Sequence, residues 1–284
     1  MKDIRLIHVA SGETVTFGCD GFILDEYDIG SIEALHKTYA GYSQSGEYRI
    51  SSRFGRRGIL LRFHILADGM DDMEEKKRKL TRVADPVGSF EFCLEKKRVL
   101  CVAAGTADFS EKVEAKKGLV ARGTLRILCL APCFYAEDER RVVYGAYTGQ
   151  LAFPVEATAE PILMGYMPSR NTLRMQNGGD VAAGLTVTVT AKSDCGSFRM
   201  SRADGTESFA FNRPIAKGQT LRICTEYGKK SVTLSDGEGA VSAIQYVDPQ
   251  SDFFRIGVGE NIFTYDCGGG DAVITLAMRE QYLI

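Results

Sequence analysis

The sequence contains no tryptophan and only three histidines in 284 residues. Histidine is the commonest general base and a frequent metal ligand, yet His8, His36 and His64 each stand alone in the sequence. The nucleophile elbow G-x-S-x-G, the zinc helix H-E-x-x-H and the phosphate-binding P-loop are also missing. Gly257-Val258-Gly259 lacks the third glycine and the following helix of a dinucleotide site. We therefore expect no enzyme activity, no catalytic residue, no cofactor and no metal site.

An excess of positive charge and a long apolar run are lacking too. The formal net charge is −2, so a nucleic-acid partner has no basic surface to bind and is not expected. No stretch of 18 apolar residues occurs, which argues against membrane insertion. Charged residues interrupt the first 15 positions every two or three residues, so we expect no secretory signal peptide.

The eight cysteines are spread along the chain, and only Cys129 and Cys133 lie close together, spaced C-x-x-x-C. No second pair with the spacing of zinc ligands follows them. Disulfides are rare in reducing compartments, and free cysteine packs as a small apolar residue. We therefore predict that the cysteines are reduced and mostly buried.

The first half of the sequence predicts a β domain with one helix. The helix is expected over Gly69–Ala84, where acidic residues precede basic ones and Pro86 follows. Its buried stripe would comprise Met70, Met73, Leu80 and Val83. Strands are expected at Ile4–Val9, Thr14–Phe17, Glu47–Ser52, Gly58–Leu66, Ser89–Leu94, Arg98–Ala103, Thr106–Glu114 and Leu119–Leu130. A basic turn, Arg53–Arg57, would separate two of these strands.

The second half of the sequence predicts an antiparallel β-sandwich. Short strands recur about every ten residues, and Leu185–Ala191 alternates apolar and polar side chains without a break. Ser251–Asp266 is typical of a hairpin, with glycines at the turn between two runs of β-formers. The chain is thus predicted to be mainly β with two domains: an N-terminal domain at 1–135, a linker or arm at 136–150, and a C-terminal sandwich at 151–284.

Several motifs in fixed order resemble a known family. Ser251–Tyr265 fits the pattern S-x-F-F-x-I-x-x-G-x-N-x-F-x-Y, which is similar to the last hairpin of the distal tail proteins of long-tailed bacteriophages. The landmarks before it are Asn177-Gly178, the opening Gly218–Leu221 and the lysine pair Lys229-Lys230, and Arg279-x-x-Tyr282 follows. Ala131-Pro132-Cys133-Phe134-Tyr135 resembles the end of the family's N-terminal domain. The match departs at Gln219, where the family often has aspartate, and after Val232, where Asn-Gly is common.

The resemblance implies a virion structural protein of a phage or prophage tail tip, made in the host cytoplasm. It implies an N-terminal split-barrel domain that forms a homo-oligomeric ring, hexameric by the family's habit, and a galectin-like or jelly-roll C-terminal sandwich. The implied partners are the tail tube, the tape-measure protein and the tail-tip, receptor-binding or tail-fibre proteins.

Composition that is typical of exposed segments suggests where such contacts would lie. The candidate residues are Tyr39, Tyr42, Arg53, Arg56, Arg57, Tyr144 and Tyr147. A carbohydrate-binding module is the main alternative, with Tyr227, Tyr246 and Tyr265 as glycan contacts. A cell-envelope hydrolase is the other alternative, because 37 acidic residues leave room for a carboxylate pair.

Overall fold

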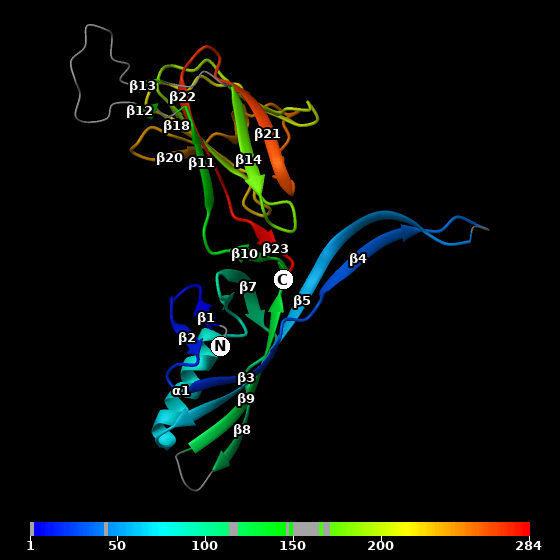
Figure 1. The fold of residues 1–284 in the computed structure, drawn as a ribbon, viewed down its shortest axis with the longest axis vertical. Helices are drawn as coiled ribbons and strands as arrows, with labels where there is room; N and C mark the ends of the chain where they lie inside the picture. Colours follow the sequence, from blue (N-terminus) through cyan, green and yellow to red (C-terminus); the bar gives the residue numbers. More distant parts are fainter. Residues whose placement is uncertain (1–2, 43–44, 114–118, 146–147, 150–164, 167–170) are drawn as a thin grey trace. The chain divides into compact units, whose positions relative to one another are not determined.

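The chain is built mainly from antiparallel strands, which confirms the predicted fold class. The computed structural model describes residues 3–42, 45–113, 119–145, 148–149, 165–166 and 171–284 (Figure 1). The chain divides into two compact units, of which unit 1 comprises Met1–Glu137 with Tyr282–Ile284 and unit 2 comprises Asp138–Gln281. No helix in the described ranges has the length and apolar character needed to cross a membrane.

Unit 1 is an extended sheet with a single helix among its described residues. The central strand order is β2-β1-β6-β7-β9-β5-β3, and β4, β8, β10 and β23 pair beside this path. The strands are β1 (Ile4–His8), β2 (Thr14–Phe17), β3 (Phe22–Asp28), β4 (Ile32–Tyr39), β5 (Tyr48–Ala67), β6 (Phe90–Leu94), β7 (Lys97–Ala103), β8 (Asp108–Val113), β9 (Leu119–Cys129), β10 (Phe134–Ala136) and β23 (Gln281–Tyr282).

The helix α1 (Met70–Val83) lies where the sequence predicted it. Met73, Leu80 and Val83 are buried in the core of unit 1, as expected for the apolar stripe. The prediction is wrong for Met70, whose side chain is 65% exposed. A helical side chain leans over the turn before its own, and Met70, as the first residue, has no such turn.

A basic turn at Arg53–Arg57 was predicted wrongly, because β5 runs without interruption through all five residues. The register between β4 and β5 shifts near Gly55, between Ile32 and Ala34 of the facing strand. A Cβ atom at Gly55 would lie only 3.0 Å from the Glu33 Cβ. The glycine therefore marks a bulge at a close approach of two strands rather than a turn.

Unit 2 consists of two antiparallel sheets whose inner faces contribute to one core. The first has the order β11-β22-β15-β18-β19-β20 and the second β14-β21-β16-β17. Their strands are β11 (Arg140–Tyr144), β14 (Thr172–Asn177), β15 (Thr186–Ala191), β16 (Phe198–Arg202), β17 (Ser208–Phe211), β18 (Thr220–Cys224), β19 (Ser231–Ser235), β20 (Ala240–Ser242), β21 (Gly259–Asp266) and β22 (Ala272–Met278). A short pair, β12 (Thr148–Gly149) and β13 (Gly165–Tyr166), and the 3-10 turn η1 (Ile244–Tyr246) complete the described elements.

Two predictions in unit 2 need correction. Arg140–Tyr144 is not a linker, because it pairs in register with Met278–Ile274 of β22 as an edge strand. Phe253–Ile256 is not the first strand of a hairpin: only Ile256 forms a bridge, to Ala183. Side chains rather than a neighbouring strand hold much of this segment, as described below.

Six of the eight cysteines are buried, in line with the prediction, whereas Cys19 is exposed and Cys224 is intermediate. All eight are free thiols.

Candidate interaction surfaces

The most distinctive surface of unit 1 is a two-stranded ribbon formed by β4 and the first half of β5 (Figure 1). We call Ile32–Tyr39 together with Tyr48–Arg56 the β4–β5 ribbon. Among the described residues, β4 pairs only with β5, and β5 pairs with β9 from Arg57 onward. The ribbon therefore has two open edges, each with unpaired backbone groups available to a further strand.

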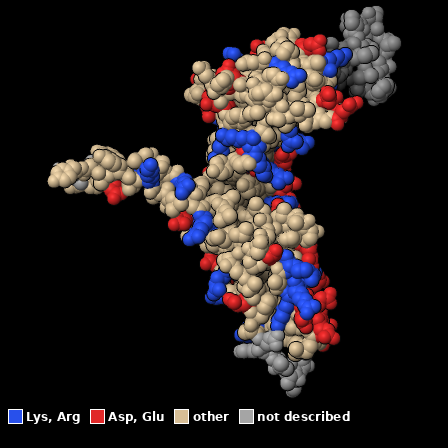
Figure 2. Space-filling model, turned by 180° about the vertical axis from the view of Figure 1, so that it is seen from behind, with Lys and Arg blue, Asp and Glu red and all other residues tan. Residues whose placement is uncertain are grey.

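Large apolar and aromatic side chains are exposed along this ribbon. Tyr39 lies opposite Tyr48, and both are more than 60% exposed. Ile50 and Phe54 continue the series with at least half of their surface exposed. Figure 2 shows mostly uncharged surface along the ribbon, with a few basic and acidic residues. An isolated two-stranded ribbon is marginally stable in water, and exposed apolar clusters mark interaction sites.

The predicted contact residues of this region divide into two groups. Tyr39, Tyr42, Arg53 and Arg56 are exposed on the ribbon or at its tip. Arg57, by contrast, is only 2% exposed, so its selection as a surface residue was wrong. From Arg57 onward β9 pairs with the second edge of β5, and alternate residues of β5 are buried from the same position.

A groove of about 760 Å³ lies beside α1 in unit 1. It is lined by His8, Ser11, Glu13, Glu74, Lys77, Arg78, Thr81, Arg82, Asp85 and Phe109. Glu13 and Arg82 form an ion pair of 2.7 Å, and the hydrogen bond from Arg82 lowers the pKa of the Glu13 carboxyl. His8 Nδ1 lies 2.9 Å from Ser11 Oγ and also accepts the Ser11 N–H, which is a local contact within one turn.

Tyr144, predicted as a partner contact, has a bonding role inside unit 2. Its hydroxyl accepts the N–H of Arg174 at 2.6 Å and donates to the carbonyl of the same residue. The side chain thereby joins β11 of one sheet to β14 of the other. Tyr147 lies outside the described residues.

The three candidate glycan tyrosines stand on different elements. Tyr227 is 91% exposed in the turn between β18 and β19. Tyr246 in η1 makes an edge contact with Phe211 and carries the Arg213 guanidinium 4.7 Å from its ring centre. Tyr265 in β21 packs against the core, and its burial raises the pKa of its hydroxyl. Tyr227 is the most exposed of the three, since Tyr246 and Tyr265 are half-buried.

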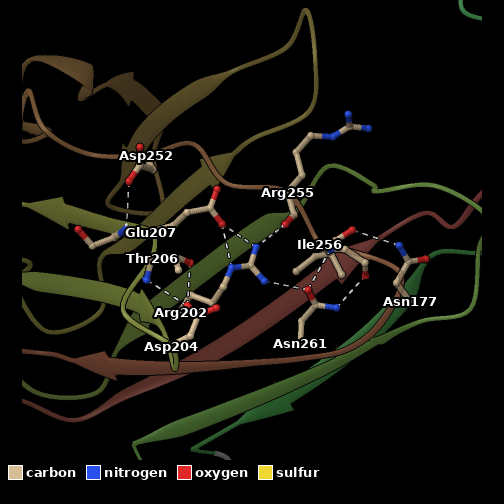
Figure 3. A network of polar contacts seen from close by, with 11 residues as sticks. Asn177, Arg202, Asp204, Thr206, Glu207, Asp252, Arg255, Ile256 and Asn261 are labelled. Carbon is tan, nitrogen blue, oxygen red and sulfur yellow. Dashed lines mark hydrogen bonds and ion pairs between the residues drawn. The ribbon is translucent and has the colours of Figure 1, made fainter. Parts of the chain in front are cut away.

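The segment Ser251–Val258 is held by a polar network that the sequence did not reveal (Figure 3). The Asn261 side chain accepts the Gly257 N–H at 2.9 Å and donates to the Gly257 and Gly259 carbonyls. Arg202 donates to Asn261 Oδ1 at 3.0 Å and to the Arg255 carbonyl at 2.9 Å. The Arg202 guanidinium also pairs with Glu207 at 2.7 Å.

Asn177 secures the same segment from the other side. Its amide nitrogen donates to the Ile256 carbonyl at 3.1 Å and to the Val181 carbonyl at 3.0 Å. Both asparagines are almost fully buried, at 1% for Asn177 and 4% for Asn261. The motif asparagines Asn177 and Asn261 therefore shape a loop, and the amides replace the missing strand ladder.

Comparison with known proteins supports a tail origin. The family model described as siphovirus-type tail component, C-terminal domain, matches residues 178–282. No curated protein sequence matches the chain.

Among solved structures, the SPP1 Dit protein (gp 19.1) aligns with a TM-score of 0.70 and 10% identity over 98% of both chains. It is described as a paradigm of the hub adsorption apparatus in phages that infect Gram-positive bacteria. The phage P2 baseplate in its activated conformation, with calcium or with strontium, aligns with a TM-score of 0.52 at 9% and 10% identity, over 99% of this chain and 98% of the other. Residues 178–282 thus match the C-terminal domain of siphovirus-type tail components, and the whole chain has the fold of the Dit protein.

Proposed function

We propose that this protein forms a closed ring at the end of a phage tail tube, and that the β4–β5 ribbon of each copy binds the next copy. A structural role in a tail hub or baseplate is supported by the tail-component match at residues 178–282 and by the fold that the chain shares with Dit and baseplate structures. We propose the ring, its six copies and its neighbours in the tail. The neighbours would be the tail tube, the tape-measure protein and the receptor-binding or fibre proteins.

The observation that carries the proposal is the exposed ribbon. Its open edges can accept a strand from another chain, and its aromatic side chains can be buried in the same contact. A ribbon on one copy that meets a different surface on the next copy gives a heterologous interface, which closes into a ring when the rotation fits. The role is structural, and no catalytic step is part of the proposal.

The test is solution mass by light scattering over a wide range of protein concentration, combined with a double variant of the ribbon. Tyr39→Ser with Tyr48→Ser removes two exposed rings that a neighbouring copy would bury. Burial of one such side chain contributes about 1.5–3 kcal/mol, so the double variant should weaken association roughly a hundredfold or more. Tyr227→Ser is the matched control, because this exposed tyrosine lies in unit 2.

We expect a closed oligomer near six chains for the parent and the control, and smaller species for the double variant. A parent that remains monomeric alone should form the ring when its tail-tube partner is added. Equal assembly of parent and double variant under both conditions would contradict the role of the ribbon. Binding of glycans that is lost in the Tyr227 variant would favour the carbohydrate-binding alternative.

A further inference from the structure

Three neighbouring strands of unit 1 align an arginine and two cysteines in one row on the buried face of the sheet. Arg57 of β5 lies opposite Cys129 of β9. In the pairing of β7 with β9, Val102 faces Leu128, so the next position along places Cys101 opposite Cys129. All three residues are 2% exposed or less. We call them the Arg57–Cys129–Cys101 row.

The two sulfur atoms of this row are in contact. Cys101 Sγ and Cys129 Sγ lie 3.1 Å apart. Facing residues of antiparallel strands have Cα atoms about 4.5–5.5 Å apart, a separation that lies within the range of disulfides. A covalent bond between the two sulfurs therefore requires only a small local movement.

Arg57 adds a buried positive charge at one end of the row. Its Nη2 donates to the Leu283 carbonyl, and the Phe134 ring lies 5.1 Å from the guanidinium carbon. Its Nε and Nη1 are buried without a hydrogen-bond partner among the described residues. Because a buried cation is costly unless an anion is near, the facing Cys129 thiol is favoured as a thiolate.

Electrostatics separates the roles of the two thiols. The hydrogen bond with Cys101 lowers the pKa of the Cys129 thiol, and the Arg57 guanidinium lowers it further. Burial raises the pKa of the Cys101 thiol. Cys129 is thus the nucleophile, and Cys101 is the thiol that stays protonated beside it.

We propose that Cys129 and Cys101 form an oxidant-sensitive modification site that closes to a cross-strand disulfide when the protein meets a hydroperoxide. The Cys129 thiolate attacks one peroxide oxygen, the O–O bond breaks, and the departing hydroxide takes the proton of Cys101 to give water. The Cys101 thiolate then attacks Cys129 Sγ, forming the S–S bond and releasing the sulfenic oxygen as hydroxide. The two sulfurs together lose two electrons, and the peroxide gains them. Hydrogen peroxide is close to water in size, which suits a pair that larger oxidants cannot reach.

Unit 2 contains a natural comparison pair, Cys195 and Cys267. Both are buried to a similar degree, at 1% and 5% exposure. Burial raises the pKa of Cys195 and raises that of Cys267 to about 12, and the nearby Asp271 carboxylate raises both. The surroundings of this pair are therefore acidic where those of the unit 1 pair are basic. The Arg57–Cys129–Cys101 row should react with peroxide at least tenfold faster, because each pKa unit changes the thiolate fraction about tenfold.

The test treats the reduced full chain with hydrogen peroxide for increasing times, followed by denaturation, alkylation of free thiols, trypsin digestion and mass spectrometry. The expected first product links peptide 99–112, which contains Cys101, to peptide 127–140. Because peptide 127–140 contains both Cys129 and Cys133, the Cys133→Ala variant assigns the bond. A thiol reductant should reverse it. The control Cys93→Ala, which removes a buried thiol on the neighbouring strand β6, should leave the link unchanged.

Arg57→Met keeps most of the side-chain volume and removes the charge. In this variant the Cys101–Cys129 link should form at a rate at least roughly tenfold lower than in the parent. If this variant fails to fold, the proposal is still tested in the parent chain by the ratio of the rates at which the two cysteine pairs form their links. A first link at Cys195–Cys267, equal rates for both pairs, or oxidation of Cys129 to sulfinic acid without a link to Cys101 would overturn the proposal.

Discussion

Replacing Asn261 with alanine tests the claim that side-chain amides hold the segment Ser251–Val258 in place. The asparagine is 4% exposed, and its amide makes four hydrogen bonds. The variant leaves the Gly257 N–H, two glycine carbonyls and one guanidinium nitrogen of Arg202 without their partner. The remaining contacts of Arg202 with Glu207 and the Arg255 carbonyl are retained.

The magnitude follows from the number and exposure of these groups. A hydrogen bond contributes about 0.5–1.5 kcal/mol net, and a buried group left unpaired costs about 1–3 kcal/mol. Gly257 and Gly259 are half-buried, so water can hydrogen-bond to some of the backbone groups that lose the Asn261 amide. We therefore expect Asn261→Ala to lower the free energy of unfolding of unit 2 by about 2–4 kcal/mol. Asn261→Asp keeps an acceptor for Gly257 and Arg202 but sets a second carboxylate oxygen against the Gly257 and Gly259 carbonyls, so it should not be milder than the alanine variant.

The assay is urea unfolding of the full chain followed by hydrogen-exchange mass spectrometry, which lets peptides from unit 2 report apart from those of unit 1. Exchange should rise first in residues 251–258 of the alanine variant. Asn212→Ala is the matched control, because Asn212 is exposed and makes a single long contact of 3.4 Å with Asp248. It should change stability by less than about 0.5 kcal/mol. Equal effects of the Asn261 and Asn212 variants would refute the account of the loop.

Three further predictions concern other contacts. Gly123→Ala should destabilise unit 1 by about 1–3 kcal/mol, because its Cβ would lie 2.4 Å from the buried Phe63 ring, whereas Gly105→Ala meets no atom within 4 Å and should be neutral by the same urea assay. Tyr144→Phe should lower the stability of unit 2 by about 1 kcal/mol in thermal unfolding, since both Arg174 backbone groups lose the hydroxyl. The pKa of Glu13 in the folded protein is depressed below its usual 4.5. The Glu13 carboxylate therefore stabilises the fold at neutral pH, and this stabilisation is lost as the pH falls through the folded-state pKa. Glu13→Gln should flatten the acid unfolding curve over that pH range.

Local patterns in the sequence predicted many of the regular elements, although no strand was predicted between Phe17 and Glu47, where the structure has β3 and β4. The helix over Gly69–Ala84 followed from its charge order and the proline after it, and the structure places α1 at Met70–Val83. The alternation in Leu185–Ala191 marked a strand with one buried face, as β15 confirms. Such features depend on residues near one another in the chain, and for this reason they can be read without a structure.

The errors arose where distant residues decide the conformation. Phe253–Ile256 has the composition of a strand, but Asn177 and the Ala183 backbone bind Ile256, and the Asn261 side chain binds the next residue, Gly257. The choice between strand and loop there depends on residues up to 79 positions away, and no local pattern contains that information.

The position of Arg57 also depends on pairing with a distant strand, and this position bears on function. In the sequence it is the last of three arginines around a glycine, and that composition is typical of an exposed turn. The register of β5 with β9 instead places Arg56 outside and Arg57 inside, one residue apart. Because adjacent strand residues point to opposite faces, a single step in register decides whether an arginine is available to another subunit or to a buried thiol. The exchange Arg56→Met should therefore leave the peroxide reaction of Cys129 unchanged while Arg57→Met slows it, and equal rates in the two variants would show that position in the strand does not determine the role of either arginine.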